Sequence, residues 1–153
     1  METVAAKVIE RVIDIEASPE TVYRLLTDPA EYVKWKGRLA ELEPRPGGRF
    51  RVEFASTKDI ASGEYVEVVP NRRVVFTWGW EGNEHVPPGA STVEIDLEPT
   101  AAGTRLRLVH RGLPEDAVAT HVEGWDYFLP RLTDVAEGRP AREAEHHTNA
   151  ANN

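Results

Sequence analysis

The order of its predicted elements constrains this chain more than any single motif does. One strand-like segment comes first, two short helical segments follow, five strand-like segments then stand in a row, and a single amphipathic helix comes near the end. Neighbouring strands that share one apolar face need a covering layer, and the last helix is the only long element that can supply it. We therefore predict an α+β fold in which a curved antiparallel sheet of about six strands wraps around a long C-terminal helix.

The strands are predicted from runs of apolar residues bounded by turn signals. The first, at 8–16, carries apolar side chains on both faces, so we expect it to be covered on both sides for part of its length. Residues 36–48 are expected to form a loop. The remaining five strands are predicted at 49–54, 60–69, 73–80, 93–97 and 105–110.

The helices are predicted from their start signals. Ser18 and Asp28 are each followed by proline, which suits the first position of a helix, and each can accept a hydrogen bond from the first turn. Two short helices at an angle are therefore expected after the first strand. The long helix is predicted over 114–137, where apolar residues recur with helical spacing and Gly138 supplies the stop.

Length and charge set outer limits on the function. A chain of 153 residues fits one domain, predicted over 1–138, followed by a disordered polar tail at 139–153. A net charge of −8 argues against nucleic acid as a partner. There is no cysteine, no leader and no stretch long enough to span a bilayer. We expect a cytoplasmic protein that does not insert into membranes, and we leave a weak homodimer open.

Five fragments of the sequence, in this order, resemble the START-like superfamily, also called SRPBCC, and within it the family of activator of Hsp90 ATPase homologues. They cover about residues 8–138. The fragments are ASPETVYRLLTDPAEYVKW, RPGGRFRVEF, GEYVEVVPNRRVVFTW, STVEIDLEPTAAGTRLRLVHRGL and HVEGWDYFLPRL.

The resemblance implies a helix-grip fold with a cavity between the sheet and the last helix. It implies little about activity, because related proteins include ligand carriers, polyketide aromatase/cyclases and hormone receptors. One position departs from the family pattern. Members often have a second tryptophan after the one that matches Trp35, and here that position is Lys36. We therefore expect a more polar mouth to the cavity.

Aromatic side chains supply the main indication of a binding site. Indole and phenyl rings offer apolar area at little conformational cost, and they commonly line pockets for small molecules. Each single ring could instead simply fill the core. The predicted ligand-binding residues are Trp35, Phe76, Trp78, Trp80, His110, His121, Trp125 and Phe128.

His110 and His121 are also the candidate catalytic residues, because one is predicted to face inward from the last strand and the other lies on the apolar stripe of the long helix. Imidazole titrates near neutral pH, as a general acid or base requires. The alternative is a pair of buried histidines with satisfied hydrogen bonds. Arg11 or Asp14 could orient a ligand, although surface charges are the simpler interpretation. Tyr65 could donate a hydrogen bond from its hydroxyl, although packing is the preferred interpretation.

The leading hypothesis is a non-enzymatic protein that binds a small, largely hydrophobic ligand in an internal cavity. One alternative is a polyketide cyclase/aromatase-like enzyme that uses the cavity histidines. A second is a stress- or chaperone-associated interaction module, which would need an exposed apolar patch. No catalytic motif, metal-ligand spacing or phosphate loop is present in the sequence, so no cofactor and no metal are expected.

Overall fold

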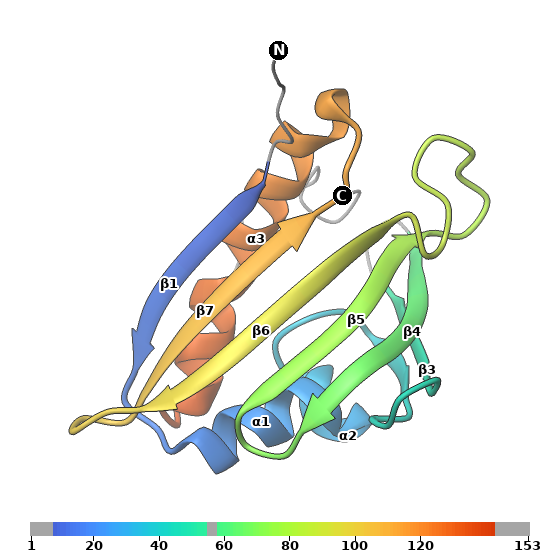
Figure 1. The fold of residues 1–153 in the computed structure, drawn as a ribbon. Coiled ribbons are helices and arrows are strands. Elements are labelled where there is room, and N and C mark those ends of the chain that lie inside the picture. Colours follow the sequence, from blue (N-terminus) through green and yellow to red (C-terminus); the bar gives the residue numbers. More distant parts are fainter. Residues whose placement is uncertain (1–7, 55–57, 143–153) are drawn as a thin grey trace.

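The computed structural model describes residues 8–54 and 58–142 (Figure 1). Its antiparallel strands form one seven-stranded sheet in the order β1-β7-β6-β5-β4-β3-β2. The strands are β1 (Ile9–Ile15), β2 (Leu39–Leu42), β3 (Arg49–Glu53), β4 (Ile60–Val69), β5 (Arg73–Trp80), β6 (Ser91–Pro99) and β7 (Thr104–Arg111). The helices are α1 (Pro19–Thr27), α2 (Pro29–Tyr32) and α3 (Val118–Ala136).

The predicted fold class is confirmed, with one strand more than the approximate number expected. The additional strand is β2, which lies in the segment predicted to be a loop and pairs with β3 at the edge of the sheet. A strand of four residues at an edge needs few apolar side chains. Leu42 is buried but Leu39 is exposed, so the segment has too short an alternation to stand out in the sequence.

The first strand is covered on one face only, so the expectation of cover on both faces is wrong. Ile9 and Ile15 are buried, whereas Val12 is 53% exposed and Val8, just before the strand, is also exposed. The reason is that the helices pack against the face of the sheet that carries Ile9 and Ile15, so Val12 on the opposite face meets solvent. Isolated surface valines are common in globular proteins, and their presence does not require a second layer.

The two short helices begin where their capping residues predict. The Ser18 hydroxyl accepts a hydrogen bond from the Thr21 backbone N–H at 3.2 Å. The Asp28 carboxylate accepts from the N–H groups of Ala30 at 2.9 Å and Glu31 at 3.3 Å. These bonds satisfy donors that have no partner inside a helix. The Asp28 cap also fixes the turn between α1 and α2.

The long helix starts one turn later than predicted, because Glu115–Ala117 form a 3₁₀ turn and α3 begins at Val118. Figure 1 shows α3 lying against the sheet, with α1 and α2 gathered near one end of it. The part of the chain that the structure describes holds no helix that is both long and apolar enough to cross a bilayer.

The first residues after α3 pack back onto it. Arg139 and Arg142 both donate to the carboxylate of Asp134, which is buried near the end of the helix. Residues 143–153, which make up most of the predicted tail, lie outside the described residues.

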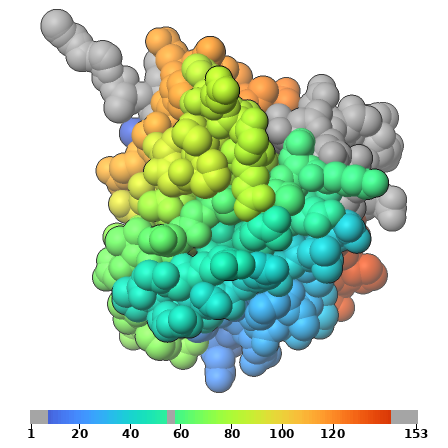
Figure 2. Space-filling model, turned by 90° about the vertical axis from the view of Figure 1, so that its right-hand side faces the viewer, coloured from blue at the N-terminus to red at the C-terminus, as the bar shows by residue number. Residues whose placement is uncertain are grey.

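Aromatic rings fill the space between the sheet and the helices. Phe50 of β3 stacks on Phe76 of β5 with ring centroids 4.1 Å apart, and Trp78 packs edge-on against Trp80 at 5.4 Å. Figure 2 shows the side of the molecule that β2, β3 and β4 close, with α1 and α2 below and the loop after β5 above. The core is therefore an aromatic layer that the sheet encloses and α3 covers.

Candidate functional site

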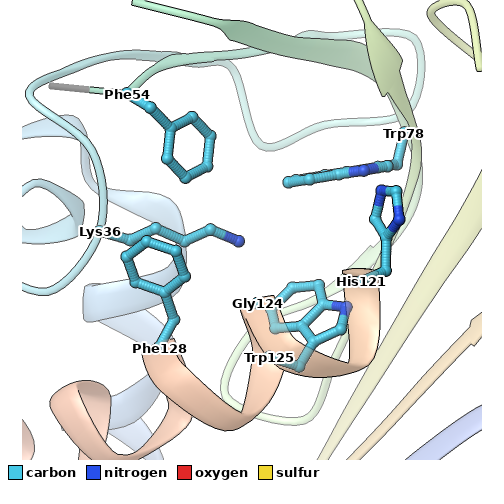
Figure 3. A pocket seen from close by; sticks show the side chains of 7 residues that line it. All are labelled: Lys36, Phe54, Trp78, His121, Gly124, Trp125 and Phe128. Carbon is cyan, nitrogen blue, oxygen red and sulfur yellow. The ribbon is translucent and has the colours of Figure 1, made fainter. Parts of the chain in front are cut away.

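A small cavity lies between the sheet and α3 (Figure 3). Its volume is about 10 Å³, close to the space that one water molecule needs. Most of the lining is aromatic, and the rings come from β5, α3 and the residue that follows β3. The lining residues are Lys36, Phe54, Trp78, His121, Gly124, Trp125 and Phe128.

Lys36 is the charged residue of this cavity, and it is only 3% exposed. It stands four residues after the end of α2, where its backbone N–H donates to the carbonyl of Tyr32 at 3.1 Å and turns the side chain inward. Figure 3 shows its amine pointing between the rings. The Nζ atom lies 4.0 Å from the ring centroid of Trp125 and 4.6 Å from that of Trp78.

The surroundings of this amine affect its protonation in opposite directions. Within residues 8–54 and 58–142 it makes no hydrogen bond and no ion pair, so its positive charge has no counter-charge there. Burial lowers the pKa of Lys36 from its ordinary 10.5 to about 7. The faces of Trp78 and Trp125 favour the ammonium form and partly offset this desolvation. Near neutral pH, a substantial fraction of the amine is therefore uncharged.

His110 of β7 stands in a chain of hydrogen bonds. The indole N–H of Trp125 donates to His110 Nδ1 at 3.0 Å. Nδ1 is therefore an acceptor, and the ring proton of the neutral imidazole is on Nε2, which lies 2.8 Å from the Ser91 hydroxyl oxygen. The Ser91 hydroxyl in turn donates to the carbonyl of Trp78 at 2.9 Å. Both ring nitrogens are occupied.

His121 of α3 is held in the opposite tautomer. The indole N–H of Trp80 donates to His121 Nε2 at 3.1 Å, so the proton of this imidazole is on Nδ1, which lies 2.8 Å from the carbonyl of Ala117 one turn earlier in the chain. Its ring centroid is 5.4 Å from that of His110. The two imidazoles lie side by side, but each is bound to other groups.

Burial makes both histidines hard to protonate. It lowers the pKa of His110 well below the usual range, and the neighbouring His121 and Lys36 add to the effect. Burial also lowers the pKa of His121. Protonation would put a hydrogen on a nitrogen that already accepts from an indole N–H. Both rings are thus neutral, and their geometry is that of structural histidines.

The structure places four of the predicted ligand-binding residues around the cavity, namely Trp78, His121, Trp125 and Phe128. The other four lie behind this lining. Trp35 donates its indole N–H to the carbonyl of Leu25 at 2.8 Å. Phe76 stacks on Phe50. Trp80 and His110 each form a hydrogen bond with a lining residue.

Three lining residues were not among the predicted site residues. Phe54 continues the inward alternation of β3, and Gly124 lies on the predicted apolar stripe of the long helix, so both patterns were visible in the sequence. Lys36 was recognised only as a departure from the family pattern. It does not make the mouth of the cavity polar, because it is buried at the centre of the rings.

The other polar candidates lie away from this cavity. Arg11 donates to Asp126 of α3 at 2.7 Å in a partly exposed ion pair, and Asp14 pairs with Arg105. The Tyr65 hydroxyl is buried with no hydrogen-bond partner among the described residues, and the same holds for the indole N–H of Trp78, which does line the cavity. The same residues contain no group of three or more histidine, aspartate or glutamate side chains that could hold a metal ion.

Comparison with known proteins finds one family. The family model described as activator of Hsp90 ATPase homolog 1-like protein matches residues 16–137. A curated relative, activator of 90 kDa heat shock protein ATPase homolog 2 from Mus musculus, is 31% identical over 102 residues. That match takes in 65% of this chain and 28% of the relative, so the chain spans less than a third of this relative's length.

Two solved structures share the fold along most of this chain. An AHSA1-like protein from Rhizobium etli, determined in solution, is 42% identical with a TM-score of 0.72, and the alignment covers 96% of this chain and 98% of that one. DynU16, a protein in the dynemicin biosynthetic locus, is 27% identical with a TM-score of 0.75, covering 89% of this chain and 49% of that one.

Proposed function

This chain belongs to the family of activator of Hsp90 ATPase homolog 1-like proteins, and from that premise we propose that it binds a small, largely apolar ligand between the sheet and α3. The observation that carries the proposal is the aromatic cavity around an amine with no counter-charge among the described residues. Such a combination of apolar walls and one polar group is typical of small-molecule sites. The helix-grip architecture of the START-like superfamily commonly holds hydrophobic ligands in the same place.

The ligand binds by displacing side chains. A cavity of about 10 Å³ holds about one water, whereas pockets for drug-sized ligands measure about 300–1,000 Å³. Lys36 is the side chain that moves most readily, because it is unbranched and no hydrogen bond to a described residue fixes its amine. A small shift of this amine, with the nitrogen still facing the cavity, would make room for an apolar group against the rings of Trp78 and Trp125.

The test measures the binding of two probes, toluene and nitrobenzene, by tryptophan emission and by native mass spectrometry. A Phe128→Leu variant enlarges the cavity and should bind both probes more tightly than the wild type. Phe76→Leu is the matched control, because Phe76 is equally buried but does not line the cavity. The proposal fails if no probe binds the wild type and neither variant differs from it.

A cyclase-like enzyme is a weaker candidate. It requires His110 or His121 to exchange protons with a substrate, and both nitrogens of each ring already have partners. The family resemblance to polyketide proteins alone does not supply a reacting group.

A chaperone-associated role also lacks an observation that favours it. Exposed large apolar side chains among the described residues are spread over or beside β1, β2 and β4, which are not all neighbours in the sheet. Two curated relatives named as activators of the 90 kDa heat shock protein ATPase are each more than three times as long as the region that matches this chain.

A weak homodimer and a cytoplasmic location stay predictions from the sequence. Sedimentation equilibrium over a range of protein concentrations tests the first, and fractionation of cells that express the chain tests the second.

A further inference from the structure

We propose that Lys36 Nζ captures a small aldehyde or ketone as a Schiff base inside the aromatic cavity. The inference rests on the proposed function, because the cavity must first admit a ligand. It adds the chemical class of that ligand and the atom to which it becomes bound.

The geometry leaves this amine available for bond formation. Most buried lysines are held in an ion pair, but Lys36 Nζ has no carboxylate partner and no hydrogen bond within residues 8–54 and 58–142. Its neighbours are ring faces, and it lies 5.3 Å from the ring centroid of Phe128 and 5.8 Å from that of Phe54. Ring faces offer no N–H or O–H donor that would engage the nitrogen lone pair in place of a carbonyl carbon.

The titratable groups that face the amine do not supply a negative charge. They are His121 on α3 and His110 on β7, and both are neutral imidazoles. Any positive charge on either ring would oppose protonation of the lysine. Burial is what keeps a large share of the amine neutral near pH 7. An ordinary surface lysine with a pKa near 10.4 is only about 0.04% neutral at that pH.

The reaction balances without a cofactor. The nitrogen lone pair attacks the carbonyl carbon, a C–N bond forms, and a proton moves from nitrogen to the former carbonyl oxygen to give a carbinolamine. Loss of that hydroxyl with the second amine proton releases one water and leaves the C=N bond. A desolvated amine in an apolar site is the usual form of a Schiff-base lysine, and exclusion of water by the rings favours the imine.

The apolar part of the carbonyl compound has a defined place. The rings of Trp78 and Trp125 lie nearest the nitrogen, so an alkyl or aryl substituent on the imine carbon would lie against indole faces. The present cavity holds about one water, so every carbonyl compound enters by moving side chains, and the smallest require the least movement. Acetaldehyde is therefore the first probe and benzaldehyde the second.

The experiment traps the imine by reduction. The full chain is incubated at pH 7 with limiting acetaldehyde and cyanoborohydride, and ethylated lysines are located by peptide sequencing in a mass spectrometer. Lys34 is the internal control, two residues away, exposed and paired with Glu31. We expect ethylation of Lys36 to exceed that of Lys34 by at least about tenfold, because of its larger neutral fraction. Labelling of Lys34 equal to or above that of Lys36 overturns the inference.

Two further arms separate this inference from the proposed function. In urea the preference for Lys36 should disappear, since it depends on the folded cavity; a preference that persists would refute the role of the cavity. Toluene, which has no carbonyl, is tested for binding in parallel. If toluene binds but Lys36 is not labelled, the apolar site stands and the Schiff base is refuted. If neither occurs, both proposals are refuted.

A pair of variants tests whether the reaction takes place in the cavity. Phe128→Leu replaces a lining ring with a smaller side chain and should raise labelling of Lys36 by benzaldehyde severalfold. Phe76→Leu, outside the lining, should leave it unchanged. Equal labelling of Lys36 in the two variants would contradict a reaction inside this cavity.

Discussion

Replacement of Lys36 by methionine should stabilise the protein at neutral and acidic pH but have much less effect at alkaline pH. Methionine is unbranched, fills irregular apolar space and carries no charge, so it keeps most of the packing against the rings while removing the buried amine. Lys36 is 3% exposed as a residue, and its amine has no counter-charge among the described residues. The variant therefore isolates the free energy of protonating a buried lysine.

The sign follows from the two pKa values of Lys36. The value is about 7 in the folded chain and near 10.5 when the chain unfolds, so between these pH values the unfolded state binds one more proton. Unfolding is then increasingly favoured as the pH falls from 10.5 to about 7, and the effect is constant below that. At 1.36 kcal/mol per pH unit, the full shift corresponds to about 5 kcal/mol. The ring faces oppose the desolvation, so this is an upper figure.

Urea denaturation of the wild type and the Lys36→Met variant at pH 6, 7, 8, 9 and 9.5 measures this effect directly. The difference in unfolding free energy should be about 3 kcal/mol larger at pH 6 than at pH 9.5. Lys34→Met is the matched control, because Lys34 is exposed, and its difference from the wild type should stay within a few tenths of a kcal/mol, roughly, at every pH.

A Lys36→Met difference that stays flat from pH 6 to pH 9.5 would refute the reasoning. It would mean that the Lys36 amine reaches water or an unrecognised counter-charge in the folded chain, and that the desolvation inferred from the rings around it does not exist in solution. The Schiff-base inference would then lose its neutral nucleophile as well.

Three further predictions concern other parts of the structure. Long-range nitrogen–proton NMR spectra should show His110 as the Nε2–H tautomer and His121 as the Nδ1–H tautomer, with neither ring titrating near pH 6.5; a normal titration would contradict the indole hydrogen bonds. A double-mutant cycle between Arg11 and Asp126 should give a coupling of about 1 kcal/mol or less, because the pair is partly exposed; a much larger value would place the pair in a drier environment. Asp134→Asn should lower the unfolding free energy by about 2–3 kcal/mol at pH 7, since the buried carboxylate accepts from two arginines that hold its pKa far below the usual range. That loss should vanish as the pH falls toward the lowered folded pKa, and a loss that is independent of pH would rule out the ionised carboxylate as its cause.

The fold could be predicted from the sequence because its signals are local and repeated. The alternation of Phe50 and Val52 marks a half-buried strand, and the caps at Ser18 and Asp28 mark the starts of the two short helices. The edge strand β2 was missed because four residues at an edge carry almost no alternation. The start of α3 was placed one turn early because proline at position 114 also suits a 3₁₀ turn.

The candidate site could be predicted only in part, because its chemistry depends on distances between elements. The sequence indicates that His110 and His121 face inward, but not that indole N–H groups occupy their acceptor nitrogens. Lys36 shows the limit most clearly. A lysine in a polar turn is normally a surface residue, and nothing near it in the sequence indicates that three elements will close around its amine.

The hydrogen bonds of the four indoles determine which polar groups remain for a ligand. The N–H groups of Trp80 and Trp125 each bind a neighbouring histidine, and that of Trp35 binds a backbone carbonyl. Trp78 alone among them has no acceptor within the described residues. An unpaired buried donor costs free energy that a ligand acceptor can recover. Among the residues that line the cavity, the unpaired polar groups are therefore the Trp78 N–H and the Lys36 amine. A compact ligand with one oxygen and an apolar body matches these two groups better than a polyhydroxylated ligand does.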